Sequence, residues 1–132
     1  MNLLLDTHIV IWSASEPSRL PADVALELEN PANSLWYSPV SVWETCLLAE
    51  KERIVIEGSP AESVRRIYQA LPLREAALNT EVALQSRAVK LPHQDPADRF
   101  IAATAMVYEL ILVTADQRIL GARELQLLDA SS

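Results

Sequence analysis

Short continuous apolar runs recur along the chain, separated by longer stretches in which apolar residues return every three or four positions. Continuous runs of about four to eight residues that end at polar or turn residues are typical of buried strands. They predict strands at Asn2–Leu5, Ser34–Tyr37, Leu73–Leu78, Leu110–Thr114 and Glu124–Leu128. The run Leu110–Thr114 is apolar enough for a parallel strand that is covered on both faces.

The stretches between these runs predict helices, because their apolar residues fall on one side of a helical turn. Ser38-Pro39, Ser59-Pro60 and Asp95-Pro96 each supply an N-cap residue followed by a proline in the first helical position. The predicted helices are His8–Ala14, Pro21–Asn30, Pro39–Glu50, Ala61–Leu71, Asn79–Leu91 and Pro96–Glu109. Since strands and helices alternate, we expect an α/β fold, a three-layer α/β/α sandwich around a mainly parallel sheet of about four to five strands.

Glycine and cysteine are too rare for several classes of site. Gly58 and Gly121 are the only glycines, which excludes a glycine-rich dinucleotide fingerprint and a P-loop, because both need several glycines close together. Cys46 is the only cysteine, so an internal disulfide framework is excluded and we expect a cytoplasmic protein. With 132 residues we expect a single domain over 1–132.

Neither secretion nor membrane insertion is predicted. Asp6 falls where a signal peptide would be apolar, and the longest apolar stretch, Phe100–Ala115, is interrupted by Glu109 and shorter than the ~20 residues of a membrane span. The net charge of −7, from 18 acidic and 11 basic residues, argues against broad adhesion to nucleic acid. It leaves room for a nucleic-acid substrate, because bound cations would reverse the charge locally.

Two aspartates lie just beyond the carboxyl ends of predicted strands. Asp6 comes after Asn2–Leu5, and Asp116 lies two residues beyond Leu110–Thr114. In parallel α/β sheets, ligands collect beyond the carboxyl ends of the strands. We therefore expect both carboxylates on one rim of the sheet.

Two further carboxylates lie on predicted helices. Val40, Trp43 and Leu47 define an apolar face, which we expect to pack inward, and Glu44 lies on that face. Asp98 precedes a series of apolar residues at helical spacing and is expected to point inward too. Burying unpaired carboxylates is costly, so a shared cation is the economical explanation. An all-oxygen set of this kind suits Mg²⁺.

The chain resembles the PIN-domain ribonucleases, and in particular the VapC-type toxins of bacterial toxin–antitoxin pairs. The resemblance spans Asn2 to about Leu128 and depends on four motifs in order. These are Leu4-Leu-Asp-Thr-His-Ile-Val-Ile-Trp12, Ser38-Pro-Val-Ser-Val-Trp-Glu44, His93-Gln-Asp-Pro-Ala-Asp-Arg-Phe-Ile101 and Val113-Thr-Ala-Asp116. One departure is Lys51–Arg53, where related sequences often carry a glycine.

The resemblance implies an Mg²⁺- or Mn²⁺-dependent endoribonuclease that cleaves a structured RNA, such as a tRNA or rRNA loop. It also implies a cognate antitoxin and a homodimer. The catalytic and metal-binding residues that it implies are Asp6, Glu44, Asp98 and Asp116, with support from Thr114 and Thr7. Asp95 would either support these ligands or cap its helix, and we favour the cap because Pro96 follows it.

The basic residues near the acids have open roles. Arg99, Arg118, Lys90 and His93 are candidates for contact with RNA phosphates, although ordinary solvated or ion-paired side chains fit the sequence equally well.

Two other classes of function remain open. One is a catalytically silent interaction module with the PIN fold. The other is an Mg²⁺-dependent phosphoacceptor domain, which would want paired acids at the first strand and a lysine at a late strand end. Here Asp6 is followed by Thr7-His8, and the late strand ends in Thr114-Ala-Asp116. The tryptophans Trp12, Trp36 and Trp43 are interpreted as core or interface residues.

Overall fold

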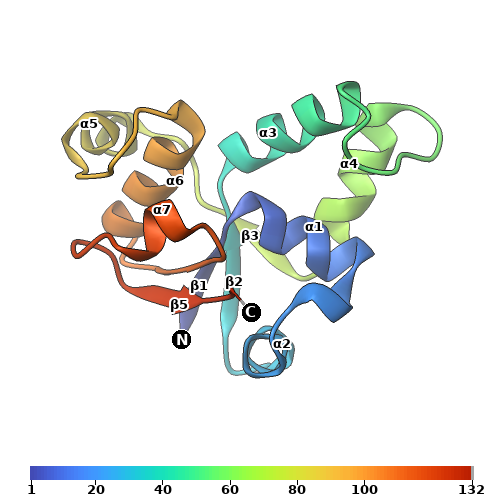
Figure 1. Ribbon diagram of the computed structural model, residues 1–132, viewed down its shortest axis with the longest axis horizontal. Helices are drawn as coiled ribbons and strands as arrows, with labels where there is room; N and C mark the ends of the chain where they lie inside the picture. Colours follow the sequence, from blue (N-terminus) through green and yellow to red (C-terminus); the bar gives the residue numbers. More distant parts are fainter. Residues whose placement is uncertain (132) are drawn as a thin grey trace.

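The computed structural model describes residues 1–131 and has a five-stranded parallel sheet at its centre (Figure 1). The strands are β1 (Asn2–Leu5), β2 (Ser34–Tyr37), β3 (Leu73–Glu75), β4 (Ile111–Thr114) and β5 (Leu127–Asp129). Their order is β3-β2-β1-β4-β5, with Leu5 paired to Val113. The chain order reverses at β1, so β1 and β4 form the type of switch point at which α/β folds bind ligands.

Helices cover both faces of the sheet, which confirms the three-layer prediction. They are α1 (Thr7–Ser15), α2 (Ala22–Glu29), α3 (Pro39–Glu50), α4 (Pro60–Gln69), α5 (Thr80–Ala88), α6 (Pro96–Val107) and α7 (Gln117–Leu120), with a short 3₁₀ helix η1 (Pro17–Arg19). Figure 1 shows α6 and α7 on one side of the strands, α1 and α4 on the other, and α3 reaching across between them. None of the helices over residues 1–131 has the length and apolar character needed to cross a bilayer.

Alternation along β1 builds a core on each face. Leu3 and Leu5 pack with residues of α1, α2 and α4 such as Val24 and Ile67. Leu4 packs on the opposite face, with residues of α6 and α7. Because β1 is buried on both faces, the residue that follows it is held rigidly at the centre of the sheet rim.

Several boundaries differ from the sequence-based predictions. The third strand ends at Glu75 instead of Leu78, and the last strand covers Leu127–Asp129 instead of Glu124–Leu128. Helix α5 ends at Ala88 instead of Leu91, and the backbone is already extended at Val89. The sequence pattern gave no signal for η1.

The inward face predicted for α3 is wrong. The buried residues are Ser41, Thr45 and Ala49, whereas Trp43 on the predicted face is 55% exposed. The Thr45 hydroxyl lies 2.7 Å from the Ser41 carbonyl oxygen and 2.9 Å from the hydroxyl of Tyr68. Small side chains and hydroxyl contacts thus pack α3 against its neighbours, whereas Val40 and Leu47 of the predicted face are only half-buried and Trp43 is exposed.

Candidate functional site

A hollow of about 380 Å³ lies at the carboxyl ends of β1 and β4, and all four predicted carboxylates line it. Asp6 follows β1, Glu44 comes from α3, Asp98 from α6 and Asp116 follows β4. We call this cavity the acidic hollow. The rest of its lining comes from His8, Ile9, Trp12, Arg19, Asp95, Ala115 and Arg118. Side chains that are far apart in sequence therefore converge, as the strand-end pattern predicts.

Asp6 is held from two sides. Its backbone N–H donates to the Val113 carbonyl oxygen at 3.0 Å, which ties the end of β1 to β4. Its carboxylate accepts a hydrogen bond from the Thr7 N–H at 2.8 Å and from the Thr114 hydroxyl at 2.7 Å. Burial raises the pKa of Asp6, and these two hydrogen bonds oppose that rise without cancelling it. The predicted supporting residues Thr7 and Thr114 thus fix the orientation of this carboxylate.

Asp116 is held by the first turn of α7, which it caps. Its carboxylate accepts from the Arg118 backbone N–H at 2.9 Å and from the Arg118 guanidinium at 3.0 and 3.2 Å. Although partial burial acts in the opposite direction, these contacts hold the pKa of Asp116 below its ordinary value. The Asp116 N–H also donates to the Thr114 hydroxyl at 3.1 Å, so Thr114 links Asp116 to Asp6.

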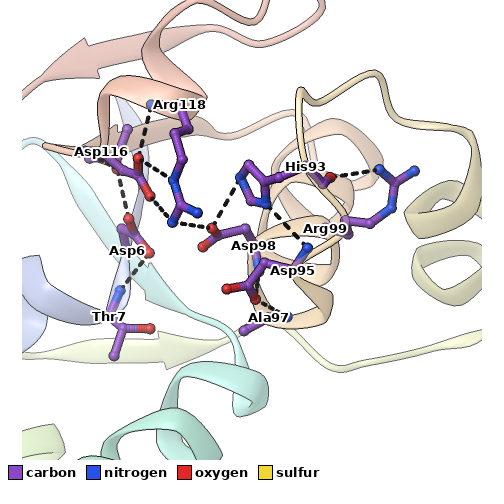
Figure 2. A network of polar contacts seen from close by, with 10 residues as sticks. Asp6, Thr7, His93, Asp95, Ala97, Asp98, Arg99, Asp116 and Arg118 are labelled. Atoms are coloured by element: carbon purple, nitrogen blue, oxygen red, sulfur yellow. Dashed lines mark hydrogen bonds and ion pairs between the residues drawn. The ribbon is translucent and has the colours of Figure 1, made fainter.

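Asp98 is buried in the first turn of α6, between two basic side chains (Figure 2). Its Oδ2 atom lies 3.4 Å from Arg118 Nη2 and 3.4 Å from His93 Nε2. Burial raises the pKa of Asp98 to about 7, and the charges of Asp6 and Asp95 add to that effect. Such a site has a strong electrostatic demand for a cation.

Asp95 is the N-cap of α6, as favoured from its sequence. Its Oδ1 atom accepts from the N–H groups of Ala97 at 3.0 Å and Asp98 at 3.4 Å. The Asp95 N–H donates to His93 Nδ1 at 3.1 Å. Since Nδ1 accepts, a neutral His93 carries its proton on Nε2, the atom that faces Asp98 and has no hydrogen-bond partner within residues 1–131. His93 therefore lies against the carboxylate of Asp98, one of the expected metal-binding residues.

Glu44 enters the acidic hollow from α3 and is half-buried. Burial raises the pKa of Glu44, and the negative charges of Asp6 and Asp95 also favour its protonated form. Its environment is therefore another sign that negative charge exceeds positive charge in the hollow.

Arg99 does not lie where an RNA contact would need it. The residue is 5% exposed, and its guanidinium donates inward to four backbone carbonyl oxygens. These belong to Ser86 (2.8 Å), Arg87 (3.2 Å), Val89 (2.9 Å) and His93 (3.4 Å). Arg99 thus caps the end of α5 and anchors the segment before α6, so its guanidinium is turned away from the position of an RNA phosphate.

Lys90 also lies apart from the acids. It is exposed after α5, its backbone N–H donates to the Glu124 carboxylate at 2.8 Å, and within the described chain it is not part of the acidic hollow's lining. The candidate phosphate contacts that remain beside the acids are Arg118 and His93.

The donor set fits a hard divalent cation, although the side chains lie in a closed arrangement. Over residues 1–131, no three His, Cys, Asp or Glu side chains are positioned to hold one metal ion together. Arg118 supplies the positive charge instead, because its guanidinium bridges Asp98 and Asp116 (Figure 2). Carboxylate oxygens as ligands, and a buried Asp98 whose pKa is raised to about 7, suit Mg²⁺ or Mn²⁺.

Trp12 and Arg19 line the acidic hollow although neither is among the predicted site residues. Trp12 was interpreted as core or interface, and Arg19 gave no signal in the sequence. The Arg19 guanidinium lies over the Trp12 ring, 4.3 Å from its centroid. The available clue is the position of Trp12 in α1, the helix that Asp6 caps.

Comparisons with known proteins agree with this fold. A PIN domain family model matches residues 3–125. Ribonuclease VapC22 of Mycobacterium tuberculosis is 35% identical over 121 residues, which cover 89% of each chain. The fold is similar to that of VapBC2 from Rickettsia felis bound to a promoter DNA fragment (TM-score 0.70, 15% identity, 98% of each chain). It is also similar to a toxin–antitoxin complex from Klebsiella pneumoniae (TM-score 0.66, 24% identity, 98% of each chain).

Proposed function

The chain belongs to the PIN domain family, and from this premise we propose that it is a metal-dependent endoribonuclease, the toxin of a toxin–antitoxin pair. The observation that carries the proposal is the convergence of four carboxylates from separate segments in one hollow. The similarity to Ribonuclease VapC22 supports RNA as the substrate. The family match over residues 3–125 supports one PIN domain for the chain.

Asp6 and Asp98 are proposed as the main metal ligands, since both are buried and come from opposite sides of the acidic hollow. Glu44 would bind a second ion or orient the attacking water, and Asp116 would act through coordinated water. When bound there, Mg²⁺ or Mn²⁺ would activate water as the nucleophile and stabilise charge on the scissile phosphate.

The other residues of the site hold these groups in place. Thr114 and Thr7 fix the rotamer of Asp6 through their hydrogen bonds. The Asp95 cap fixes the first turn of α6 and therefore the position of Asp98. Arg118 is exposed and can leave the carboxylates when a cation takes over their charge, which makes its guanidinium available to a phosphate oxygen.

Partners follow from the family. We propose that a cognate antitoxin binds the chain, which the toxin–antitoxin complexes of the same fold support. A hollow of about 770 Å³ lined by residues of α1, α4 and the segment before α4 offers a surface for it. We also propose that the substrate is a structured RNA loop, that the chain forms a homodimer and that it works in the cytoplasm.

Cleavage of RNA by the purified chain tests the proposal. Folded transfer RNA and ribosomal RNA fragments would be incubated with wild type and with Asp98→Asn, in Mg²⁺, in Mn²⁺ and in excess EDTA. Asp23→Asn is the matched control, because Asp23 is an exposed aspartate of α2. We expect discrete cleavage by wild type and the control in either metal, and a loss of at least ~100-fold in Asp98→Asn or EDTA. Equal cleavage by wild type and Asp98→Asn would contradict the assignment of cleavage to the acidic hollow. No cleavage by any variant would contradict the ribonuclease proposal and leave a silent PIN-fold module.

A further inference from the structure

A second hollow of about 400 Å³ adjoins the acidic hollow. Trp12, Arg19 and Ala115 line both, so the paired side chains of Trp12 and Arg19 form the boundary between them. The rest of the second hollow is lined by Ser18, Leu20, Ala130 and Ser131. We call it the side hollow. Apart from Arg19 these lining side chains are uncharged, in contrast to the carboxylates of the acidic hollow.

The boundary is anchored on one side and open on the other. Trp12 is half-buried and packs against the hydrophobic core between α1 and the sheet. Its ring supports the Arg19 guanidinium at 4.3 Å from the centroid. The side chain of Arg19 is 54% exposed, and its ion pair with Glu16 is long, at 3.9 Å, and also exposed. An exposed pair of this kind contributes little, so the guanidinium is available to a ligand.

Charge points to the same residue. Arg118 and Arg19 are the cationic side chains that line the acidic hollow in the described part of the chain, apart from a histidine. Arg118 is engaged by Asp98 and Asp116. An RNA that approaches a cluster of carboxylates needs positive charge beside it, and Arg19 provides that charge without a strong internal partner.

We propose that Arg19, backed by Trp12, is a subsite for a single-stranded RNA nucleotide next to the scissile phosphate. The nucleobase stacks on the open face of the Arg19 guanidinium and enters the side hollow, while the charge of Arg19 attracts the adjoining phosphodiester. Guanidinium planes and aromatic rings are the surfaces on which proteins stack unpaired bases. The inference rests on the proposed ribonuclease function and deepens it, because such a subsite would select unpaired over paired RNA.

Binding to a labelled RNA tests the subsite without cleavage. Fluorescence anisotropy would follow a fluorescein-labelled, mixed-sequence single strand of about twelve nucleotides, and the same RNA as a duplex, over about 50 to 200 mM KCl. All proteins would carry Asp98→Asn and be measured in Mg²⁺. The added changes are Arg19→Ala, Arg19→Lys, Trp12→Leu and Trp12→Phe, with Arg65→Ala as control for an exposed arginine outside both hollows.

The variants separate stacking from charge. Arg19→Ala should weaken single-strand binding by about tenfold and lower the salt slope by about 0.7, the value for one lost phosphate contact. Arg19→Lys should keep the slope and still lose several-fold in affinity, because an ammonium offers no plane to a base. Trp12→Leu should behave like Arg19→Lys, whereas Trp12→Phe and Arg65→Ala should stay near the parent protein. Circular dichroism melts would confirm that each variant is folded.

Other outcomes overturn the inference. Unchanged affinity in Arg19→Ala would remove the subsite, and equal losses on duplex and single strand would show charge attraction without stacking. Either result, obtained while protein with the native Asp98 cleaves RNA, leaves the ribonuclease proposal intact. If protein with the native Asp98 neither cleaves nor binds any RNA, the proposed function itself has failed.

Discussion

Replacing Asp98 by asparagine should stabilise the metal-free protein at alkaline pH while it destroys the proposed activity. Asp98 is buried, and burial together with the charges of Asp6 and Asp95 raises its pKa from 3.8 to about 7. A raised native pKa means that the folded protein holds the proton more tightly than the unfolded chain does. The stability contributed by this proton is complete below pH 3.8 and is lost as the pH rises to about 7.

The magnitude follows from the size of that displacement. A change in pKa from 3.8 to about 7 corresponds to about 4 kcal/mol, since each unit of pKa is worth ~1.36 kcal/mol. The carboxylate faces an open hollow, so solvent screening reduces this cost, and we halve it to about 2 kcal/mol. Asparagine has nearly the same shape and carries no charge. Asp98→Asn should therefore gain about 2 kcal/mol of unfolding free energy at pH 8 and almost none at pH 4.

Urea denaturation in EDTA, followed by circular dichroism at pH 4 and pH 8, measures the difference. Asp23→Asn serves as the control and should stay within about 0.5 kcal/mol of wild type at both pH values, because Asp23 is exposed. With saturating Mg²⁺ the order should reverse, because wild type gains ligand stabilisation that Asp98→Asn lacks. If metal-free Asp98→Asn is no more stable than wild type at pH 8, the charged Asp98 carboxylate does not destabilise the folded protein as inferred.

Substitutions at three other positions test the contacts around the site and its supporting helix. Arg118→Ala should lower the melting temperature in EDTA and enlarge the increase in melting temperature that Mg²⁺ produces, because the guanidinium and the ion compete for the same carboxylates. Scanning fluorimetry measures both, and identical Mg²⁺ titrations of variant and wild type would refute this. Arg99→Met should cost about 3 kcal/mol in urea denaturation, since buried carbonyl groups lose their donor, and a cost below about 1 kcal/mol would contradict the capping role. Thr114→Val should cost about 2 kcal/mol by removing the hydroxyl that donates to Asp6, whereas Thr114→Ser should keep that hydrogen bond; equal losses would show that only packing matters.

Most of the architecture could be predicted because local signals and tertiary structure agree. The apolar run at β1 is buried on both faces, and the Ser-Pro and Asp-Pro pairs open α3, α4 and α6 as predicted. The strand-end rule then placed Asp6 and Asp116 on one rim. These inferences use short-range chemistry and a topology that follows from alternating elements.

The failures have a common cause, which is that tertiary contacts overrode the local pattern. Trp43 of the predicted inner face of α3 is exposed, because the helix packs through Ser41 and Thr45, whose hydroxyls contact those of Thr7 and Tyr68. Arg99 reads as a surface cation but is buried, since four carbonyl groups converge on it after the chain folds. Arg19 belongs to η1, a turn of 3₁₀ helix without a sequence signature, and lines the acidic hollow with its guanidinium over the Trp12 ring.

The most direct test of the central claim is the anomalous scattering of a crystal soaked in Mn²⁺. The account predicts a manganese peak in the acidic hollow, coordinated by Asp6 and Asp98 directly or through water, with the Arg118 guanidinium displaced from Asp98. A soaked crystal with Arg118 still bridging Asp98 and Asp116 and no manganese in the hollow would contradict it. In that case the converging carboxylates would be neutralised by an arginine of the chain itself and would have no role in holding a metal.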